Sequence, residues 1–229
     1  HAASERRWGD LLVRPPPAAS DSDHALSCRA LSGATTLRHD LVKDAWRRAA
    51  RWAGLDSTVE PALTPLRNGN PRPHAQMARR GATTDDQADR DRGDILIVMP
   101  DAMTVVDVSI THPAAESHAP RAARVDGGGW AAQQRERIKR SQYEVAATGA
   151  YDFVPLVSES FGRLGGAARA FLGKLADVAA DGSDTFDRRM FVATVQRELG
   201  VAVQRGNAIM CKAGLRVLTR VSGHAFREG

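Results

Sequence analysis

The chain has 229 residues, of which 42% are hydrophobic, enough for one main folded domain with small appendages. Its net charge of +5 and isoelectric point near 9.7 favour a polyanionic partner such as nucleic acid, although a compositional bias toward arginine and alanine explains the same charge. No apolar run approaches the roughly 20 residues that span a bilayer, and no secretory pattern is present. Only two cysteines occur, Cys28 and Cys211. We therefore expect an intracellular protein without a membrane partner.

The first quarter of the chain predicts a linker followed by a helix. Residues 1–22 contain three consecutive prolines among small polar residues, which is typical of a linker, and a start at His1 suggests a piece of a longer polypeptide. Residues 38–53 carry apolar side chains at three- and four-residue spacing, which predicts an amphipathic helix. Residues 58–60 predict a short strand. Residues 62–91 are rich in Pro, Arg and Asp without periodicity, which predicts a mobile loop.

A β-hairpin is the clearest strand signal. Residues 95–99 and 104–110 are rich in β-branched side chains, and a turn at residues 100–101 separates them. Three glycines at residues 127–129 then predict a hinge. Residues 130–147 combine a few apolar positions with many charges, which predicts a helix with one wet face.

The last third predicts a strand and two helices. Residues 153–157 are apolar around Pro155, which indicates an edge strand or a bulge. Residues 166–179 and 188–219 have helical spacing, the latter with breaks at Gly200 and Gly206. The predicted order is helix, strand, strand, strand, helix, strand, helix, which indicates an α/β fold.

Two aspartates stand out in the hairpin. Asp94 opens its first strand, and Asp107 interrupts its apolar second strand, where an unpaired carboxylate is costly. A turn of two or four residues would pair Asp94 with Ser109 and Asp107 with Leu96. Both aspartates would then lie on one face, about 7–8 Å apart, and could share a hard cation. A three-residue turn would send them to opposite faces. Alternatively, Asp94 is a strand-start residue that faces solvent and Asp107 pairs with an arginine.

The residues around Asp94 resemble a known motif. Arg92, Gly93 and Asp94, with Asp107 after twelve further residues, resemble the Arg/Lys-Pro-Asp-x(12–14)-Asp/Glu signature of the restriction-like endonuclease at the C-terminal end of site-specific non-LTR retrotransposon polyproteins. That family belongs to the PD-(D/E)XK nucleases. The resemblance implies their α-β-β-β-α-β core, a mixed sheet flanked by helices. Gly93 replaces the family's proline, and Ser109 stands where a lysine usually follows the second acid.

The resemblance implies that the missing lysine comes from the next helix. Lys139-Arg140-Ser141-Gln142-Tyr143 is similar to the family's Lys-x-x-Lys-Tyr stretch, with Gln142 in the second lysine position. An ammonium can orient or deprotonate an attacking water, whereas a guanidinium hardly releases a proton. Tyr143 lies on the same helical face as Lys139. Alternatively, Lys139 belongs to a basic face that binds the phosphate backbone. The candidate DNA-binding residues are Arg92, Arg135, Arg137 and Arg140.

Three further residues have weaker signals. Glu60 is either the acidic residue that the superfamily places near its metal or an exposed glutamate at a strand end. His24 and Cys28 resemble the second half of a zinc knuckle, with His39 as a third ligand at irregular spacing. Because the preceding Cys-x2-Cys pair is absent, we interpret them as relics or packing residues and expect no zinc.

The resemblance implies a function and a domain plan. Asp94 and Asp107 would hold Mg²⁺ or Mn²⁺, and a nuclear enzyme would nick double-stranded DNA for retrotransposon integration. Element RNA and an upstream reverse transcriptase domain would be its further partners. Two alternatives stay open: a catalytically decayed DNA-binding module of a retroelement remnant, and a nuclease acting on RNA or branched DNA. The plan is a linker at 1–22, a zinc-knuckle remnant at 23–37, the nuclease at 38–180 and a C-terminal helical extension at 181–229.

Overall fold

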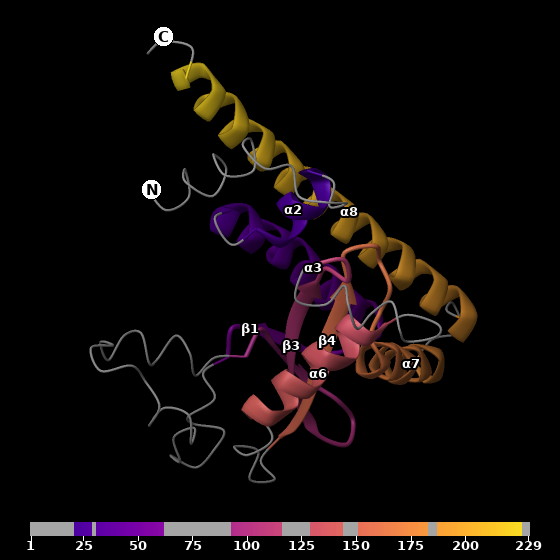
Figure 1. The fold of residues 1–229 in the computed structure, drawn as a ribbon. Helices are drawn as coiled ribbons and strands as arrows, with labels where there is room; N and C mark the ends of the chain where they lie inside the picture. Colours follow the sequence, from indigo (N-terminus) through magenta and orange to yellow (C-terminus); the bar gives the residue numbers. More distant parts are fainter. Residues whose placement is uncertain are drawn as a thin grey trace.

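The computed structural model describes residues 21–28, 31–61, 93–115, 129–143, 151–182 and 187–225. The predicted linker apart from its last two residues, the predicted loop at 62–91 and Arg92 lie outside these ranges. The elements in chain order are α2 (Asp21–Ser27), α3 (Ser32–Trp52), β1 (Ser57–Val59), β2 (Ile95–Val98), β3 (Met103–Thr111), α6 (Trp130–Tyr143), β4 (Asp152–Glu159), α7 (Gly166–Asp181) and α8 (Arg188–Ala225) (Figure 1). From α3 to α7 the predicted order of helices and strands is confirmed.

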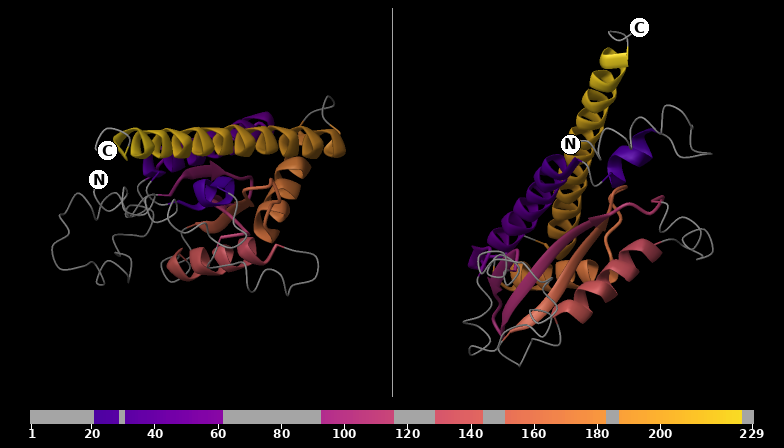
Figure 2. Two further views of the ribbon diagram at one scale, coloured as in Figure 1. Left: turned by 45° about the horizontal axis from the view of Figure 1, so that its top comes forward. Right: turned by 60° about the vertical axis from the view of Figure 1, so that its left-hand side comes forward.

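The strands form one mixed sheet in the order β1-β2-β3-β4. β1, β2 and β3 pair antiparallel, and β4 pairs parallel to β3 after the chain crosses over through α6. α3, α7 and α8 cover one face and α6 covers the other (Figure 2). Pro155 lies in β4, which is an edge strand of this sheet, as its proline predicts. The protein is therefore an α/β fold with a four-stranded mixed sheet flanked by helices.

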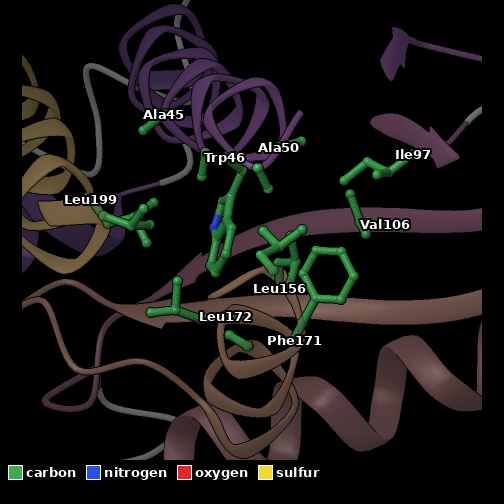
Figure 3. Close-up of a cluster of buried hydrophobic side chains, with 14 of the residues drawn as sticks. Ala45, Trp46, Ala50, Ile97, Val106, Leu156, Phe171, Leu172 and Leu199 are labelled. Carbon is green, nitrogen blue, oxygen red and sulfur yellow. The ribbon is translucent and has the colours of Figure 1, made fainter. Parts of the chain in front are cut away.

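The main hydrophobic core lies between the sheet and the three helices on its first face. Trp46 of α3 is fully buried in the layer that contains Leu156 of β4 and Leu199 of α8, and its ring lies 6.2 Å from that of Phe171 in α7 (Figure 3). A buried aromatic ring removes a large apolar area from water, so this contact stabilises the meeting point of the helices. The first half of α8 therefore shares one core with α3 and the sheet.

The predicted breaks in the last helix are wrong, because α8 is one continuous helix of 38 residues that includes Gly200 and Gly206. A Cβ at Gly206 would collide with the side chain of Arg38 and come within 3.0 Å of its Cα. A Cβ at Gly200 would meet nothing within 4 Å. Gly206 thus allows α8 to approach α3 closely, and the cost of a helical glycine is offset by packing.

The helical region before the sheet begins earlier than predicted. α3 starts at Ser32, six residues before the predicted start, and the segment assigned to a zinc-knuckle remnant forms most of α2 and the first turns of α3. Cys28 packs with Leu26, Leu31 and Met210 in a small hydrophobic cluster between these helices and α8. The N-terminal segment is therefore anchored on the distal half of α8.

Candidate functional site

A cleft of about 260 Å³ lies where α3, β3 and α6 meet. It opens beside the part of β3 that extends past the start of β2, since the pairing of these two strands ends at Ile95 and Val106. Six charged or titratable side chains line it. They are Arg38 and His39 from α3, Asp94 before β2, Asp107 in β3, and Arg135 and Lys139 from α6.

Asp94 occupies the edge of β3 that β2 leaves open. Its Oδ2 accepts a hydrogen bond of 2.6 Å from the backbone N–H of Val108. The same oxygen lies 3.0 Å from Nε2 of His39. Val108 lies beyond the end of the pairing with β2, so its backbone N–H has no partner on that strand. The Asp94 carboxylate accepts this N–H instead and is itself held in position. The backbone of β3 therefore fixes Asp94 at the cleft.

The predicted pairing of Asp94 with Ser109 and of Asp107 with Leu96 is wrong by two residues. Val98 pairs with Met103 across a turn at residues 99–102, in which the N–H of Met99 donates to the carbonyl of Ala102. The last pair is Ile95 with Val106, and the N–H of Asp94, just before β2, donates to the carbonyl of the same Val106. Asp94 and Asp107 therefore lie beside the end of the ladder, and both line the cleft.

Asp107 is held from α6, on the opposite side of the sheet from the main core. The ammonium of Lys139 lies 2.9 Å from its Oδ1 and 2.8 Å from its Oδ2. The Tyr143 hydroxyl donates to Oδ1 at 2.9 Å, and its ring stacks on Phe153 of β4 at 4.2 Å. Ser109 donates to Oδ2 at 3.4 Å. Because Asp107 is only 5% exposed, these donors compensate its burial.

Lys139 and Tyr143 reach Asp107 together because they lie one helical turn apart on α6. Arg135 lies one turn before Lys139 and lines the same cleft. Arg137 is exposed and Arg140 is partly buried, and neither lines the cleft. One face of α6 thus supplies the groups nearest the aspartates. Of the basic residues on this helix, Arg135 and Lys139 line the cleft, and Arg137 and Arg140 lie outside it.

His39 and its neighbours form a chain of alternating charges along α3. Nδ1 of His39 lies 3.4 Å from Asp40, and Lys43 bridges Asp40 at 3.1 Å and Glu60 at 3.0 Å. Burial alone lowers the pKa of His39, but the hydrogen bonds and negative charges of Asp94 and Asp40 outweigh it and raise this pKa above its ordinary value. A positively charged His39 therefore neutralises Asp94 over a wider pH range.

The carboxylate of Glu60 turns to Lys43 and does not line the cleft. Its backbone N–H donates to the carbonyl of Asp94 at 2.9 Å, and its φ of 51° is left-handed, which a glutamate rarely adopts. Glu60 thus supports the backbone of Asp94 rather than adding a third acid to the cleft.

Two cleft residues lacked an assigned role in the sequence interpretation. Arg38 and His39 resemble a family motif at the start of the first helix, for which the sequence gives no role, and His39 is otherwise a candidate third zinc ligand. Arg38 is buried and lies one turn before the buried Val42 on the same face of α3, and His39 beside it is half-buried. The sequence signal for both is this motif-like basic pair early in an amphipathic helix. The contact of His39 with Asp94 joins positions 55 residues apart, and no local pattern predicts it.

The two carboxylates of the cleft are donors that a hard cation prefers, whereas the candidate zinc ligands of the N-terminal region lie apart. Within the described residues, no three His, Cys, Asp or Glu side chains are grouped to hold a metal. His39 contacts Asp94, while Cys28 packs in the cluster with Met210, so His24, Cys28 and His39 do not form a zinc site. Two carboxylates on one wall suit Mg²⁺, which commonly binds one or two carboxylates and completes its shell with water and phosphate oxygens.

No protein-family model matches the chain, and no curated protein was found to be similar to it.

Along the segments that the structure describes, no helix is both long and apolar enough to cross a membrane.

Proposed function

We propose that this chain is a metal-dependent DNA endonuclease with a restriction-endonuclease-like core, in which Asp94 and Asp107 bind Mg²⁺ or Mn²⁺. The observation that carries the proposal is the convergence of these two carboxylates with Lys139 in one cleft. Metal-assisted hydrolysis of a phosphodiester needs carboxylates for the cation and a cationic group near the reacting phosphate. The cleft contains both.

The order of elements supports this assignment. α3, β1, β2, β3, α6 and β4 follow one another as in the α-β-β-β-α-β core that the motif around Asp94 implies. The two acids lie where β2 begins and where β3 passes it, and the lysine comes from the helix after the hairpin. These placements of the two acids and the lysine support the proposed assignment.

The oxygen atoms of the two aspartates differ in their availability to a cation. Oδ1 of Asp94 accepts no hydrogen bond from any described residue, whereas both oxygens of Asp107 face Lys139. Mg²⁺ held by these carboxylates would act as a Lewis acid that stabilises negative charge on the phosphate. Lys139 neutralises Asp107 in the absence of a cation, which keeps the two acids from repelling one another.

The protein's own groups have distinct parts in this reaction. Lys139 has three ammonium protons, and besides its contact with Asp107 it can donate to the attacking water or to a phosphate oxygen. Tyr143 fixes the orientation of the Asp107 carboxylate through its hydroxyl, while Phe153 holds its ring. The backbone N–H of Val108 and the His39 ring fix Asp94. Such fixed geometry lowers the reorganisation that the reaction requires.

Double-stranded DNA is the substrate that we infer for the cleft. The positive net charge favours a polyanion, and the motif implies a nuclear element protein that nicks its chromosomal target beside a reverse transcriptase domain and the element RNA.

A decayed DNA-binding module is the second candidate. Ser109 occupies the usual lysine position, and Gln142 lies in an exposed position on α6 where the family has a second lysine. In this alternative, the pair of Lys139 with Asp107 is a structural ion pair and the basic groups bind DNA without cutting it.

Nicking of a supercoiled plasmid separates the two functions. The nuclease proposal predicts open-circular product with Mg²⁺ and none with a chelator or with Asp107→Ala. Salt-sensitive DNA binding without nicking in the wild-type protein would instead establish the binding module. Equal nicking by the wild type and Asp107→Ala would contradict the catalytic assignment.

A further inference from the structure

Arg38 is a buried cation without an acidic partner. It is only 4% exposed, at the junction of α3 with α8. Its Nη1 donates to the carbonyl of Leu26 and to Oδ1 of Asn207, both at 3.3 Å. Among the described residues, its Nε has no hydrogen-bond partner and no carboxylate forms an ion pair with it. Both of its acceptors are neutral, so its positive charge is not compensated.

An uncompensated buried charge needs an explanation, because buried guanidinium groups are usually paired. Burial lowers the pKa of Arg38 below its ordinary value, which reflects the cost of keeping its charge away from water. Arg38 nevertheless lines the cleft that contains Asp94 and Asp107. Its positive charge therefore lies beside a space that a ligand can occupy.

The charges of the cleft leave an excess of positive groups. Lys139 pairs with Asp107 and His39 contacts Asp94, so both acids have a basic partner. Arg38 on α3 and Arg135 on α6 both line the cleft, and neither forms an ion pair with another described residue. Two arginines on different walls can contact one tetrahedral oxyanion, for which guanidinium groups are well suited.

We propose that Arg38, held in place by Asn207, is the fixed cation of a phosphate subsite in the cleft, with Arg135 on the facing helix. This inference rests on the proposed function in one respect: the natural ligand would be a phosphate of the DNA backbone. Binding of the phosphate itself requires neither metal nor cleavage, so the two proposals are separable.

Asn207 is a positioning residue in this subsite. Its amide nitrogen donates to the carbonyl of Ser160 at 2.6 Å, and the Ser160 hydroxyl lies 2.6 Å from Nδ1 of buried His112. This network fixes the Asn207 oxygen against Arg38, and Gly206 beside it leaves room for the arginine. A neutral amide orients the guanidinium without cancelling its charge, whereas an aspartate here would cancel it.

The substitution Asn207→Asp therefore tests the charge of Arg38 with little change in shape. Binding of inorganic phosphate and of dimethyl phosphate is measured by calorimetry in the presence of a chelator. We expect wild-type binding of at least one probe and an affinity at least about tenfold lower in Asn207→Asp, since an opposite charge at contact distance neutralises the guanidinium. The matched control is Gln196→Glu, the same charge change at an exposed position of α8, and it should bind as the wild type does.

Arg38→Met is the second variant, and circular dichroism checks that each variant is folded. Tighter binding of dimethyl phosphate indicates a diester of a nucleic-acid backbone, and tighter binding of inorganic phosphate indicates a terminal phosphate. No wild-type binding of either probe, or equal affinity in wild type and a folded Asn207→Asp, would overturn the subsite. A protein that binds these probes as expected but never nicks DNA would refute the nuclease and retain the subsite.

Discussion

The ammonium of Lys139 contacts both carboxylate oxygens of Asp107, at 2.9 and 2.8 Å, although the two residues come from different elements. This contact connects α6 to β3 at the cleft, and Tyr143 joins it from the next turn of the helix. An acid in an apolar strand thus acquires a cationic neighbour from the helix that follows the hairpin. In the proposed nuclease, Lys139 would take the part of the lysine that the resembled motif has two residues after its second acid.

Replacement of Lys139 by arginine should slow nicking by about 100-fold, because a guanidinium keeps a positive charge but hardly releases a proton and cannot take the compact position of an ammonium. Initial rates of plasmid nicking at saturating Mg²⁺ measure the effect. Lys174→Arg, the same change at an exposed position of α7, is the control and should leave the rate unchanged. A Lys139→Arg protein as fast as the wild type would remove Lys139 from the reaction.

Gly206→Ala should lower the free energy of unfolding by about 1–3 kcal/mol, because its Cβ collides with Arg38 and forces α8 away from α3. Gly200→Ala should raise it by about 0.5–1 kcal/mol, because no atom lies within 4 Å of the added methyl group and alanine favours the helix. Urea unfolding monitored by circular dichroism compares the two variants. Equal destabilisation by both would show that the helix tolerates neither glycine replacement and that close packing at Gly206 is not the cause.

Asp40 predicts a specific dependence of stability on pH. Burial alone raises the pKa of its carboxyl, but Lys43 and His39 beside it outweigh burial and lower this pKa below its ordinary value. The pKa of Asp40 is lower in the folded protein than in the unfolded chain. Its contribution to the free energy of unfolding is therefore present above pH 3.8, the ordinary pKa, and is lost as the pH falls through the folded pKa. The carboxylate is 44% exposed, so we expect at most about 1 kcal/mol.

The difference in free energy of unfolding between the wild type and Asp40→Asn measures this contribution. It should be constant from pH 5 to 6, disappear toward pH 2 and shrink in about 1 M salt, where exposed charges are screened. A difference that stays the same down to pH 2 would show that Asp40 acts through something other than its charge.

The elements and the two acids could be predicted from the sequence because their signals are local. β-Branched runs around a turn predicted β2 and β3, and Asp107 was conspicuous among valines. The predicted register of the hairpin was wrong by two residues. A hydrogen bond between Met99 and Ala102 sets the turn, whereas the hydrophobic pattern indicates only which face of the sheet a residue occupies. Both acids line one cleft, Asp94 in contact with His39 of α3 and Asp107 in contact with Lys139 of α6.

The long-range contacts could not be predicted. His39 meets Asp94, and Arg38 meets Asn207, only after the helices have packed on the sheet. Gly206 was interpreted as a break because a glycine in a helical pattern has the same signal whether it ends the helix or admits a close neighbour. Packing decides between these two meanings.

Magnesium-dependent nicking by Asp94→Asn and Asp107→Asn tests the central claim most directly. The matched control is Asp101→Asn, which changes an exposed aspartate in the turn of the same hairpin. Because each cleft carboxylate is assigned to the cation, both cleft variants should nick at least about 100-fold more slowly than the wild type at every Mg²⁺ concentration, and Asp101→Asn should match the wild type. Nicking by the two cleft variants at the wild-type rate, with the same dependence on Mg²⁺, would contradict the assignment of Asp94 and Asp107 as the metal-binding pair.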